Sequence, residues 1–217
     1  MRMGELSQVS GVAVATLKFY LREGLLHPGE HTAVNQADYD ESHVKRVKLV
    51  QALLYLGRLS IADTRRVIVA VDDEALPIHE AFGIAQDAMV PARDRSSERY
   101  ASALDDVDEF VARHGLRVRP DAAVRQMLAD ALVGLEECQV LPPGLEVDAA
   151  LFDDLVGPLV QRAAAEVATT PVAATRSEQV EHTVVGTIVF EVAYAALRRM
   201  ALEHASAERF PVSGATQ

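Results

Sequence analysis

Apolar residues in the first part of the chain recur at intervals of three and four, in two short blocks that each end at a glycine. The residues are Leu6 and Val9 in the first block, and Leu17, Tyr20 and Leu21 in the second. This spacing is typical of helices with one buried face. Gly11 and Gly24 follow the blocks, and glycine accepts the left-handed conformation that ends a helix. Residues 3–27 therefore predict two short helices joined by a tight turn.

A helix, a tight turn and a second helix form a helix-turn-helix, whose second helix can enter the major groove of DNA. The outward face of the predicted second helix offers methyl groups, a hydroxyl and cations, which suit thymine methyls, base edges and phosphates. Its predicted DNA-contacting residues are Val14, Thr16, Lys18, Phe19, Tyr20 and Arg22. Because many helical pairs with a glycine at the bend bind nothing, the segment that follows matters.

Proline, glycine and asparagine interrupt residues 27–39, so this segment is not helical. Val34 and Tyr39 bracket a predicted hairpin with Asn35 at its tip, since asparagine tolerates positive φ. A hairpin at this place is a wing that lies along DNA. Thr32, Asn35 and Gln36 are predicted to place it, with His27 and His31 beside it in reach of phosphate.

The next helix is predicted to begin after Asp40 as its N-terminal cap and to end near Leu56. Lys45 and Lys48 share its outer face with Arg46 beside them, an arrangement that suits phosphates. Its inward residues are Val44, Val47, Val50 and Leu54. Ser60 and Asp63 then form a capping box for a further helix.

These residues together make a resemblance plain: residues 3–70 resemble the DNA-binding domain of the MerR family of bacterial transcription regulators. The matching features are Gly4-Glu5-Leu6, Gly11-Val12, Thr16-Leu17-Lys18-Phe19-Tyr20, Gly24-Leu25-Leu26-His27-Pro28, Tyr39-Asp40-Glu41, Leu56-Gly57 and Leu59-Ser60. The resemblance implies a winged helix-turn-helix homodimer, a helical dimer contact and a variable C-terminal sensor. It also implies that a promoter spacer is distorted so that RNA polymerase can engage.

Several positions depart from the family's pattern. Ala15 and Ala37 stand where the family usually has arginine, and Ala13 replaces the usual serine cap of the second helix. The loss of two arginine–phosphate contacts predicts weaker and less salt-sensitive binding than in a typical member. The wing resembles a variant of actinobacterial members, so these changes indicate divergence.

Residues 72–91 are expected to be a transition that includes a helix over 79–90. Within 92–114 apolar residues repeat as a stripe of about two heptads. The stripe is interpreted as a dimer seam made by Tyr100, Leu104, Val107 and Val111. The alternative is a helix that packs on its own domain. The dimer is favoured because a protein that reads one half-site needs a partner.

Residues 116–217 contain no predicted strands, so the fold class is mainly α with an all-α C-terminal domain. Helices are expected over 121–137, over 148–167 with a kink at Gly157-Pro158, and over 177–208. The expected domains are 1–71 for DNA binding, 72–115 for the linker and dimerisation helix, and 116–217 for an effector or dimer domain.

The last predicted helix carries the one suggestive binding chemistry of this region. Glu191 lies between apolar turns and Tyr194 lies one turn on, so the pair could receive a cationic small-molecule effector. The alternative, which is favoured, is a solvated edge or an intrahelical Glu191–Arg198 line with water.

Charge is distributed unevenly along a chain whose formal net charge is −11. Residues 1–70 hold 9 Lys and Arg against 7 Asp and Glu, whereas residues 71–217 hold 12 against 25. A mildly basic head on an acidic body fits a DNA-binding protein. The small surplus of the head predicts that two heads act together.

Other chemistry is absent from the sequence pattern. The single Cys138 excludes an intramolecular disulfide or a cysteine-cluster metal site. The histidines do not cluster, and no catalytic motif is present, so neither a metal, a cofactor nor an enzyme is expected. Val184–Leu197 is interrupted by Glu191 and short for a bilayer, and no secretory signal is evident, which predicts a cytoplasmic protein without a membrane partner.

The sequence thus predicts a cytoplasmic, homodimeric regulator that binds a promoter inverted repeat in double-stranded DNA. RNA polymerase and a small-molecule effector are further expected partners. The alternative is a helical protein that sequesters a small molecule and carries a vestigial DNA-binding head.

Overall fold

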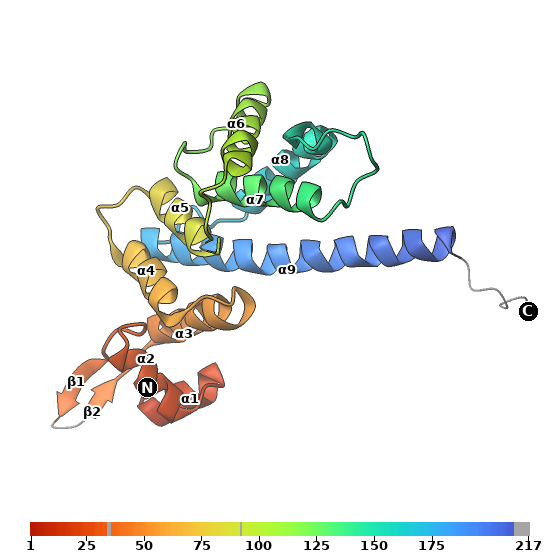
Figure 1. Ribbon diagram of the computed structural model, residues 1–217. Helices are drawn as coiled ribbons and strands as arrows, with labels where there is room; N and C mark the ends of the chain where they lie inside the picture. The colour runs from red at the N-terminus through yellow and green to blue at the C-terminus, as the bar shows by residue number, and fades with distance from the viewer. Residues whose placement is uncertain (34–35, 92, 211–217) are drawn as a thin grey trace, which may run out of the picture. The chain divides into compact units, whose positions relative to one another are not determined.

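The computed structural model describes residues 1–33, 36–91 and 93–210 (Figure 1). The described chain is mainly helical with a single small sheet, which confirms the predicted fold class. It forms two compact units: unit 1 comprises Met1–Arg65 with Glu181–Gln217, and unit 2 comprises Arg66–Val180. The expected domains 1–71, 72–115 and 116–217 divide the chain differently, since most of the last helix groups with the N-terminal head.

The first two helices of unit 1 are α1 (Met3–Ser10) and α2 (Val14–Arg22). Gly11 and Gly24 have φ of 71° and 70°, so both helices end at left-handed glycines as the sequence predicts. Leu6 and Leu17 are fully buried between the helices, which fixes the angle at which α2 is presented.

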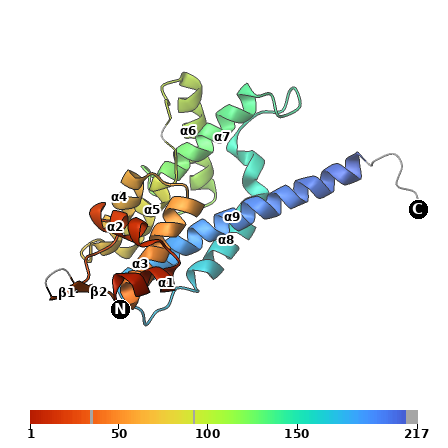
Figure 2. The same cartoon turned by 90° about the horizontal axis from the view of Figure 1, so that it is seen from below.

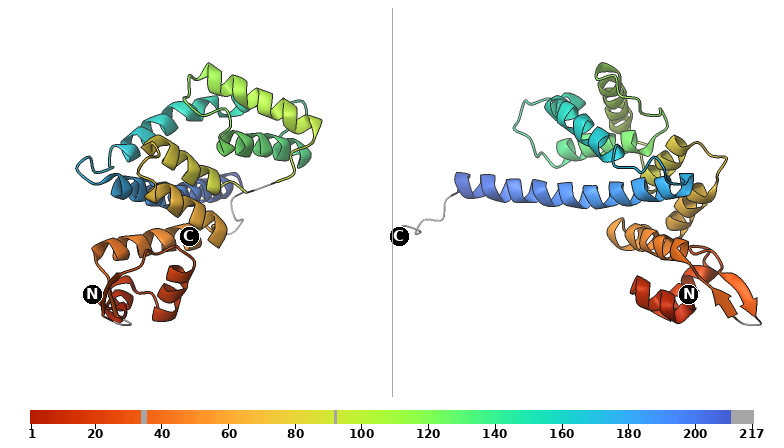
Figure 3. Two further views of the ribbon diagram at one scale, coloured as in Figure 1. Left: turned by 90° about the vertical axis from the view of Figure 1, so that its left-hand side faces the viewer. Right: turned by 180° about the vertical axis from the view of Figure 1, so that it is seen from behind.

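The predicted hairpin is present as β1 (Glu30–Ala33) and β2 (Gln36–Asp38), which pair antiparallel. Gly29 is required at its base, because a Cβ there would collide with the carbonyl oxygen of Asp38. The predicted tip at Val34 and Asn35 lies outside the described residues. Figure 3 shows the hairpin beside the helix-turn-helix of the same unit.

The third helix, α3 (Glu41–Gln51), begins at Asp40, whose side chain accepts hydrogen bonds from the backbone N–H groups of Ser42 and His43. It continues as the π-helical turn η1 (Ala52–Leu56). Leu53 is fully buried in this turn, whereas Leu54, the expected inward residue, is half-buried. The next helix, α4 (Ile61–Asp72), has the predicted cap, since Ser60 Oγ accepts a hydrogen bond from Asp63 N at 3.1 Å.

The core of unit 2 lies between α6 and α7. Its elements are α5 (Ile78–Ala88), α6 (Glu98–Arg113), α7 (Ala123–Glu137), η2 (Ala149–Phe152) and α8 (Asp153–Val167). Tyr100, Val107 and Val111 of α6 are buried in this core with Ala129 and Leu132 of α7, and Leu104 packs against it. The expected dimer seam on α6 is therefore corrected: α7 of the same chain covers this stripe, as in the alternative interpretation.

The final helix, α9, extends from Arg176 to Arg209. Val184 and Ile188 are buried, and the Ile188 side chain lies beside Gly57, where an added Cβ would be 3.5 Å from Ile188 Cδ1. None of the described residues after Ile188 is buried. Figures 2 and 3 show this C-terminal part of α9 extending away from the helix-turn-helix.

By length and composition alone, α9 would be apolar enough to cross a membrane, and among the described residues it is the one helix of this kind. The helix is longer than the apolar stretch that the sequence suggested. This property is weak support for a membrane span, because a helix that packs in a protein interface has the same composition.

Candidate nucleic-acid interface

The outer face of α2 is a line of residues spaced four apart. Val14, Lys18 and Arg22 follow one another at intervals of four residues, so they lie on one side of the helix. Lys18 and Arg22 are exposed, whereas Val14 is half-buried. The predicted contacts Thr16 and Phe19 are also half-buried. The helix therefore presents two cations with a short apolar side chain at their N-terminal end.

Tyr20 is the exception among the predicted contacts of α2. It is 1% exposed and belongs to the core of the head. Burial raises its pKa to about 12. A buried phenol cannot touch DNA, so the assignment of Tyr20 to the groove is corrected. The apolar spacing with Leu17, which the sequence also showed, was the better guide.

Three exposed cations of the head form no ion pair with an acidic residue that the structure describes. Among the described residues Lys18 and Arg22 form no ion pair, and the same holds for Lys48 on α3. An exposed lysine or arginine without a carboxylate keeps its full charge for an external anion. This face of the head is thus electrostatically available.

The predicted phosphate contacts on α3 are exposed, but the arginine beside them is not. Lys45 and Lys48 are exposed on α3, as predicted. Arg46, expected beside them, is 5% exposed and its Nε donates to Glu181 Oε1 of α9 at 3.0 Å. It is therefore corrected from a phosphate contact to an internal ion pair. The acceptor lies 135 residues further along the chain, so local sequence carried no signal for it.

A second ion pair missed from sequence holds the end of α2. Arg65 Nη2 donates to Glu23 Oε2 at 2.6 Å, and Arg65 Nε donates to the Glu23 carbonyl oxygen at 2.8 Å. Two hydrogen bonds from one guanidinium fix the C-terminal end of α2 against α4. Arg65 is thus a positioning residue for the helix that carries Lys18 and Arg22.

The wing residues are only partly described. Gln36 is exposed at the start of β2, Thr32 lies in β1, and Asn35 is outside the described residues. Arg2 Nε lies 3.4 Å from Asp38 Oδ1, and the Met1 amino group donates to the Tyr39 carbonyl oxygen at 2.6 Å. The chain's first residues therefore brace the base of the wing.

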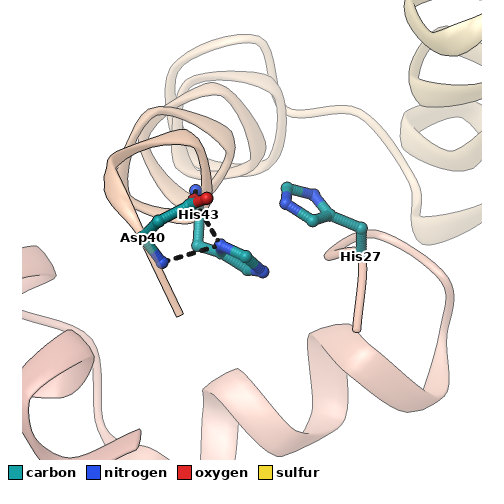
Figure 4. A group of neighbouring side chains, drawn as sticks. All are labelled: His27, Asp40 and His43. Carbon is teal, nitrogen blue, oxygen red and sulfur yellow. Dashed lines mark hydrogen bonds and ion pairs between the residues drawn. The ribbon is translucent and has the colours of Figure 1, made fainter. Parts of the chain in front are cut away.

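His27, Asp40 and His43 form a group at the junction of the wing and α3 (Figure 4). His43 Nδ1 lies 2.8 Å from Asp40 Oδ1, and the rings of His27 and His43 have centroids 3.9 Å apart. His43 is 4% exposed, and its contact with His27 corrects the expectation that the histidines do not cluster. Its Nε2 is buried and has no hydrogen-bond partner among the described residues.

The contacts of this group favour a helix cap over a metal site. Its candidate ligand atoms lie within 4.8 Å of one another. Zinc at its usual bond lengths needs ligand atoms about 3.3 Å apart. Asp40 Oδ1 already accepts hydrogen bonds from Ser42 N at 3.0 Å and Ser42 Oγ at 2.6 Å, besides its contacts with His43. These hydrogen bonds hold the pKa of Asp40 well below its usual range, and they explain the group as the cap of α3.

The predicted effector residues lie on the part of α9 that follows its buried segment. Glu191 is exposed by area, although nearby protein atoms remove enough water from its carboxylate to raise its pKa. Tyr194 is half-buried, and its ring stacks on Phe190 with centroids 6.2 Å apart. Effector binding by this pair stays a prediction.

Comparisons with known proteins agree with this geometry. Residues 1–70 match the family model described as MerR HTH family regulatory protein. The structure of SCO5550 from Streptomyces coelicolor A3(2), a candidate transcriptional regulator, is 30% identical in sequence and superposes with a TM-score of 0.74 over 98% of this chain and 99% of that one. The chain belongs to the MerR family of helix-turn-helix regulators.

A MerR-family assignment also fits a more distant curated relative. Nodulation protein NolA of Bradyrhizobium elkanii is 39% identical over 67 residues. The match covers 31% of this chain and 30% of NolA, and the NolA of Bradyrhizobium sp. strain NC92 gives the same identity over the same length. The predicted family is therefore confirmed, and this chain is a regulator of the helix-turn-helix type.

Proposed function

We propose that this regulator binds an inverted repeat in promoter DNA as a homodimer, with α2 of each copy in the major groove of one half-site. The observation that carries the proposal is the exposed face of α2, where Lys18 and Arg22 lie one turn apart without acidic partners among the described residues. Such a pair can donate hydrogen bonds to guanine edges and to phosphates.

The other exposed residues of the head have separate roles. Lys45 and Lys48 on α3 contact the flanking phosphate backbone, and Gln36 orients the wing. Ala15 and Ala37 supply no charge where arginine is usual, so each head binds weakly. Two heads on one inverted repeat overcome this weakness, because the second head binds at a high effective concentration.

The regulator acts on DNA in the cytoplasm, and RNA polymerase is the partner that responds to promoter binding. A small-molecule effector would act through the helical part of the chain, with Glu191 and Tyr194 as the residues to test first. Catalysis is not part of the proposed function.

A footprint on the DNA upstream of the gene that encodes this chain tests the proposal. Wild-type protein is expected to protect two half-sites, and Lys18→Ala is expected to lose about ten-fold or more in specific affinity, as for a base-contacting cation. Arg117→Ala is the matched control, because Arg117 is an exposed cation of unit 2 that forms no ion pair among the described residues.

Two results would contradict the proposal. The first is the absence of protection at moderate salt, which would turn attention to the sequestering alternative and to a ligand screen by thermal shift. The second is an equal loss of affinity in Lys18→Ala and Arg117→Ala, which would indicate a non-specific effect of net charge.

A further inference from the structure

Glu181, near the start of α9, holds an arginine of α3 inside the head. Arg46 Nε donates to Glu181 Oε1 at 3.0 Å, and the two side chains are 6% and 13% exposed. Both residues belong to unit 1, although Glu181 lies 135 residues after Arg46. A charged pair that is mostly shielded from water attracts more strongly than a surface pair, because solvent and salt screen it less. The contact therefore fixes α3 against α9.

Apolar contacts beside this ion pair seat the same part of α9 on the head. Val184 and Ile188 are 2% and 1% exposed and lie about one and two turns after Glu181. Gly57 permits a close approach, because a Cβ there would lie 3.5 Å from Ile188 Cδ1 and only 2.9 Å from the Leu53 carbonyl oxygen. This part of α9 is therefore a packed element of unit 1 and not an appended tail.

Contacts of α3 link this anchor to the helix-turn-helix. The first helix, α1, packs against both α2 and α3. His27, which follows α2, stacks on His43 of α3 with ring centroids 3.9 Å apart, and His27 Nε2 lies 3.1 Å from Ser42 Oγ. A shift of α3 would therefore be passed to α2 within the same unit.

The angle between α2 and α3 matters because the two helices carry different kinds of proposed DNA contact. Lys18 and Arg22 of α2 are the proposed groove contacts, and Lys45 and Lys48 of α3 are the proposed phosphate contacts. Phosphate contacts fix the register of a protein on the duplex, whereas base contacts read the sequence. A change in this angle would keep the cations available for non-specific binding and would misalign them for specific binding.

We propose that Glu181 is a positioning residue for DNA reading, which holds Arg46 and thereby sets, through α3, the angle at which α2 meets its half-site. The inference rests on the proposed function, in which α2 reads DNA. It extends the DNA-reading unit beyond residues 1–70, which the family model matches, to a segment of the last helix. This segment makes no DNA contact of its own.

The test compares specific with non-specific affinity of the full chain by fluorescence anisotropy, on the footprinted duplex and on a scrambled duplex of equal length. Glu181→Gln removes the charge that Arg46 Nε contacts and keeps the shape of the side chain. It is expected to lower the ratio of specific to non-specific affinity by about ten-fold, as for one lost base contact. The non-specific affinity and its salt slope should stay as in wild type, because no phosphate contact is removed.

Two further variants control for charge and for stability. Glu203→Gln should leave the affinity ratio unchanged, because Glu203 is an exposed acid of the same helix and the change removes the same charge. Arg46→Met combined with Glu181→Leu replaces the ion pair by an apolar contact and should recover most of the lost ratio. A persistent loss in a stable double variant would mean that Arg46 itself contacts DNA, which would overturn the positioning role.

Hydrogen exchange of the DNA-free protein tests the physical basis of the proposal. In Glu181→Gln the amides of α2 and α3 are expected to exchange faster, while those of α6 and α7 in unit 2 keep their protection. Unchanged exchange in α3, or an unchanged affinity ratio in Glu181→Gln, would overturn the proposal. A general loss of stability would speed exchange in both units and would not change the affinity ratio of folded protein.

The failure of this inference can be told apart from the failure of the proposed function. If wild type protects no DNA, the proposed function and the role of Glu181 in reading fail together. A wild-type footprint with the same affinity ratio in Glu181→Gln would refute the role of Glu181 alone.

Discussion

Three exposed cations of unit 1 differ from five arginines of unit 2 in whether an acid pairs with them. Lys18, Arg22 and Lys48 of unit 1 are exposed and form no ion pair among the described residues. In unit 2, arginines pair with acids of the same unit: Arg95 with Asp130, Arg99 with Glu136, Arg113 with Asp153, Arg119 with Asp87, and Arg125 with Asp108. Pairing, more than the count of charges, therefore decides which surface can attract an external anion.

The same comparison explains why the net charge of the whole chain is a poor guide to DNA binding. Residues 66–180 hold 10 Lys and Arg against 21 Asp and Glu, whereas the rest of the chain holds 11 of each. The whole deficit of the chain thus lies in unit 2, where acids already hold helices together. An overall charge of −11 says little about the neutral unit that carries α2.

The largest effect on stability is expected at Arg46, which is buried in an ion pair of the head. Arg46→Ala should lower the free energy of unfolding by about 3–5 kcal/mol, because Glu181 would be left buried without its counter-charge. Urea unfolding measures the loss. The double variant Arg46→Met with Glu181→Leu is the control and should recover most of the stability. An equally unstable double variant would show that packing, and not the charge, is responsible.

A smaller effect on stability is expected at Asp87 of unit 2, which both pairs with an arginine and caps a helix. Asp87 pairs with Arg119 at 2.5 Å and also accepts a hydrogen bond from Ala123 N at 2.9 Å, at the start of α7. Asp87→Ala should therefore cost about 1–2 kcal/mol, and Arg119→Ala less than about 1 kcal/mol, since the second change leaves the helix cap intact. Thermal unfolding of both variants checks the order, and a larger loss in Arg119→Ala would contradict it.

The cap of α3 gives a change in stability that depends on pH. Asp40→Ala should cost about 1 kcal/mol at neutral pH, as for other N-terminal caps. The pKa of Asp40 is lowered in the folded chain by hydrogen bonds from Ser42 and His43. Its contribution is therefore complete above the ordinary carboxyl pKa and is lost as pH falls below it. Asp40→Asn should keep the cap and reduce the loss of stability in acid; an unchanged acid profile would contradict this.

The smallest effect is expected on DNA affinity, when a single exposed cation of the head is removed. Lys48→Ala should weaken DNA binding by a similar factor on all sequences and reduce the slope of log K against log salt by about 1, as for one lost phosphate contact. Fluorescence anisotropy at several salt concentrations measures this slope. Arg117→Ala in unit 2 should leave it unchanged, and a change there would erase the distinction between the two units.

Local sequence was sufficient for features whose cause lies within a few residues. Gly11, Gly24, Asp40 and Ser60 end or cap helices through contacts with close neighbours, and all four were predicted. The wing was found in the same way, from its turn residues. The match of residues 1–70 to one family then connected these local features.

Features with a distant cause were not predictable. Arg46 is charged, so sequence alone assigns it to the surface, whereas it is buried and paired with Glu181, 135 residues further along the chain. The stripe of α6 carries no sign of which helix covers it, so the sequence favoured a second copy where α7 of the same chain packs. The cap of α7 comes from Asp87, 36 residues away from Ala123. Contacts between segments far apart in the chain determine each of these features, and such contacts leave no mark on the local sequence pattern.

The most direct test of the central claim is an equilibrium titration of the footprinted DNA with the double variant Lys18→Ala and Arg22→Ala. The account predicts a loss of about a hundred-fold or more in specific affinity, with unchanged helicity and unchanged oligomeric state, because both cations of α2 would be removed. Unchanged affinity in this variant would contradict the claim that α2 reads DNA.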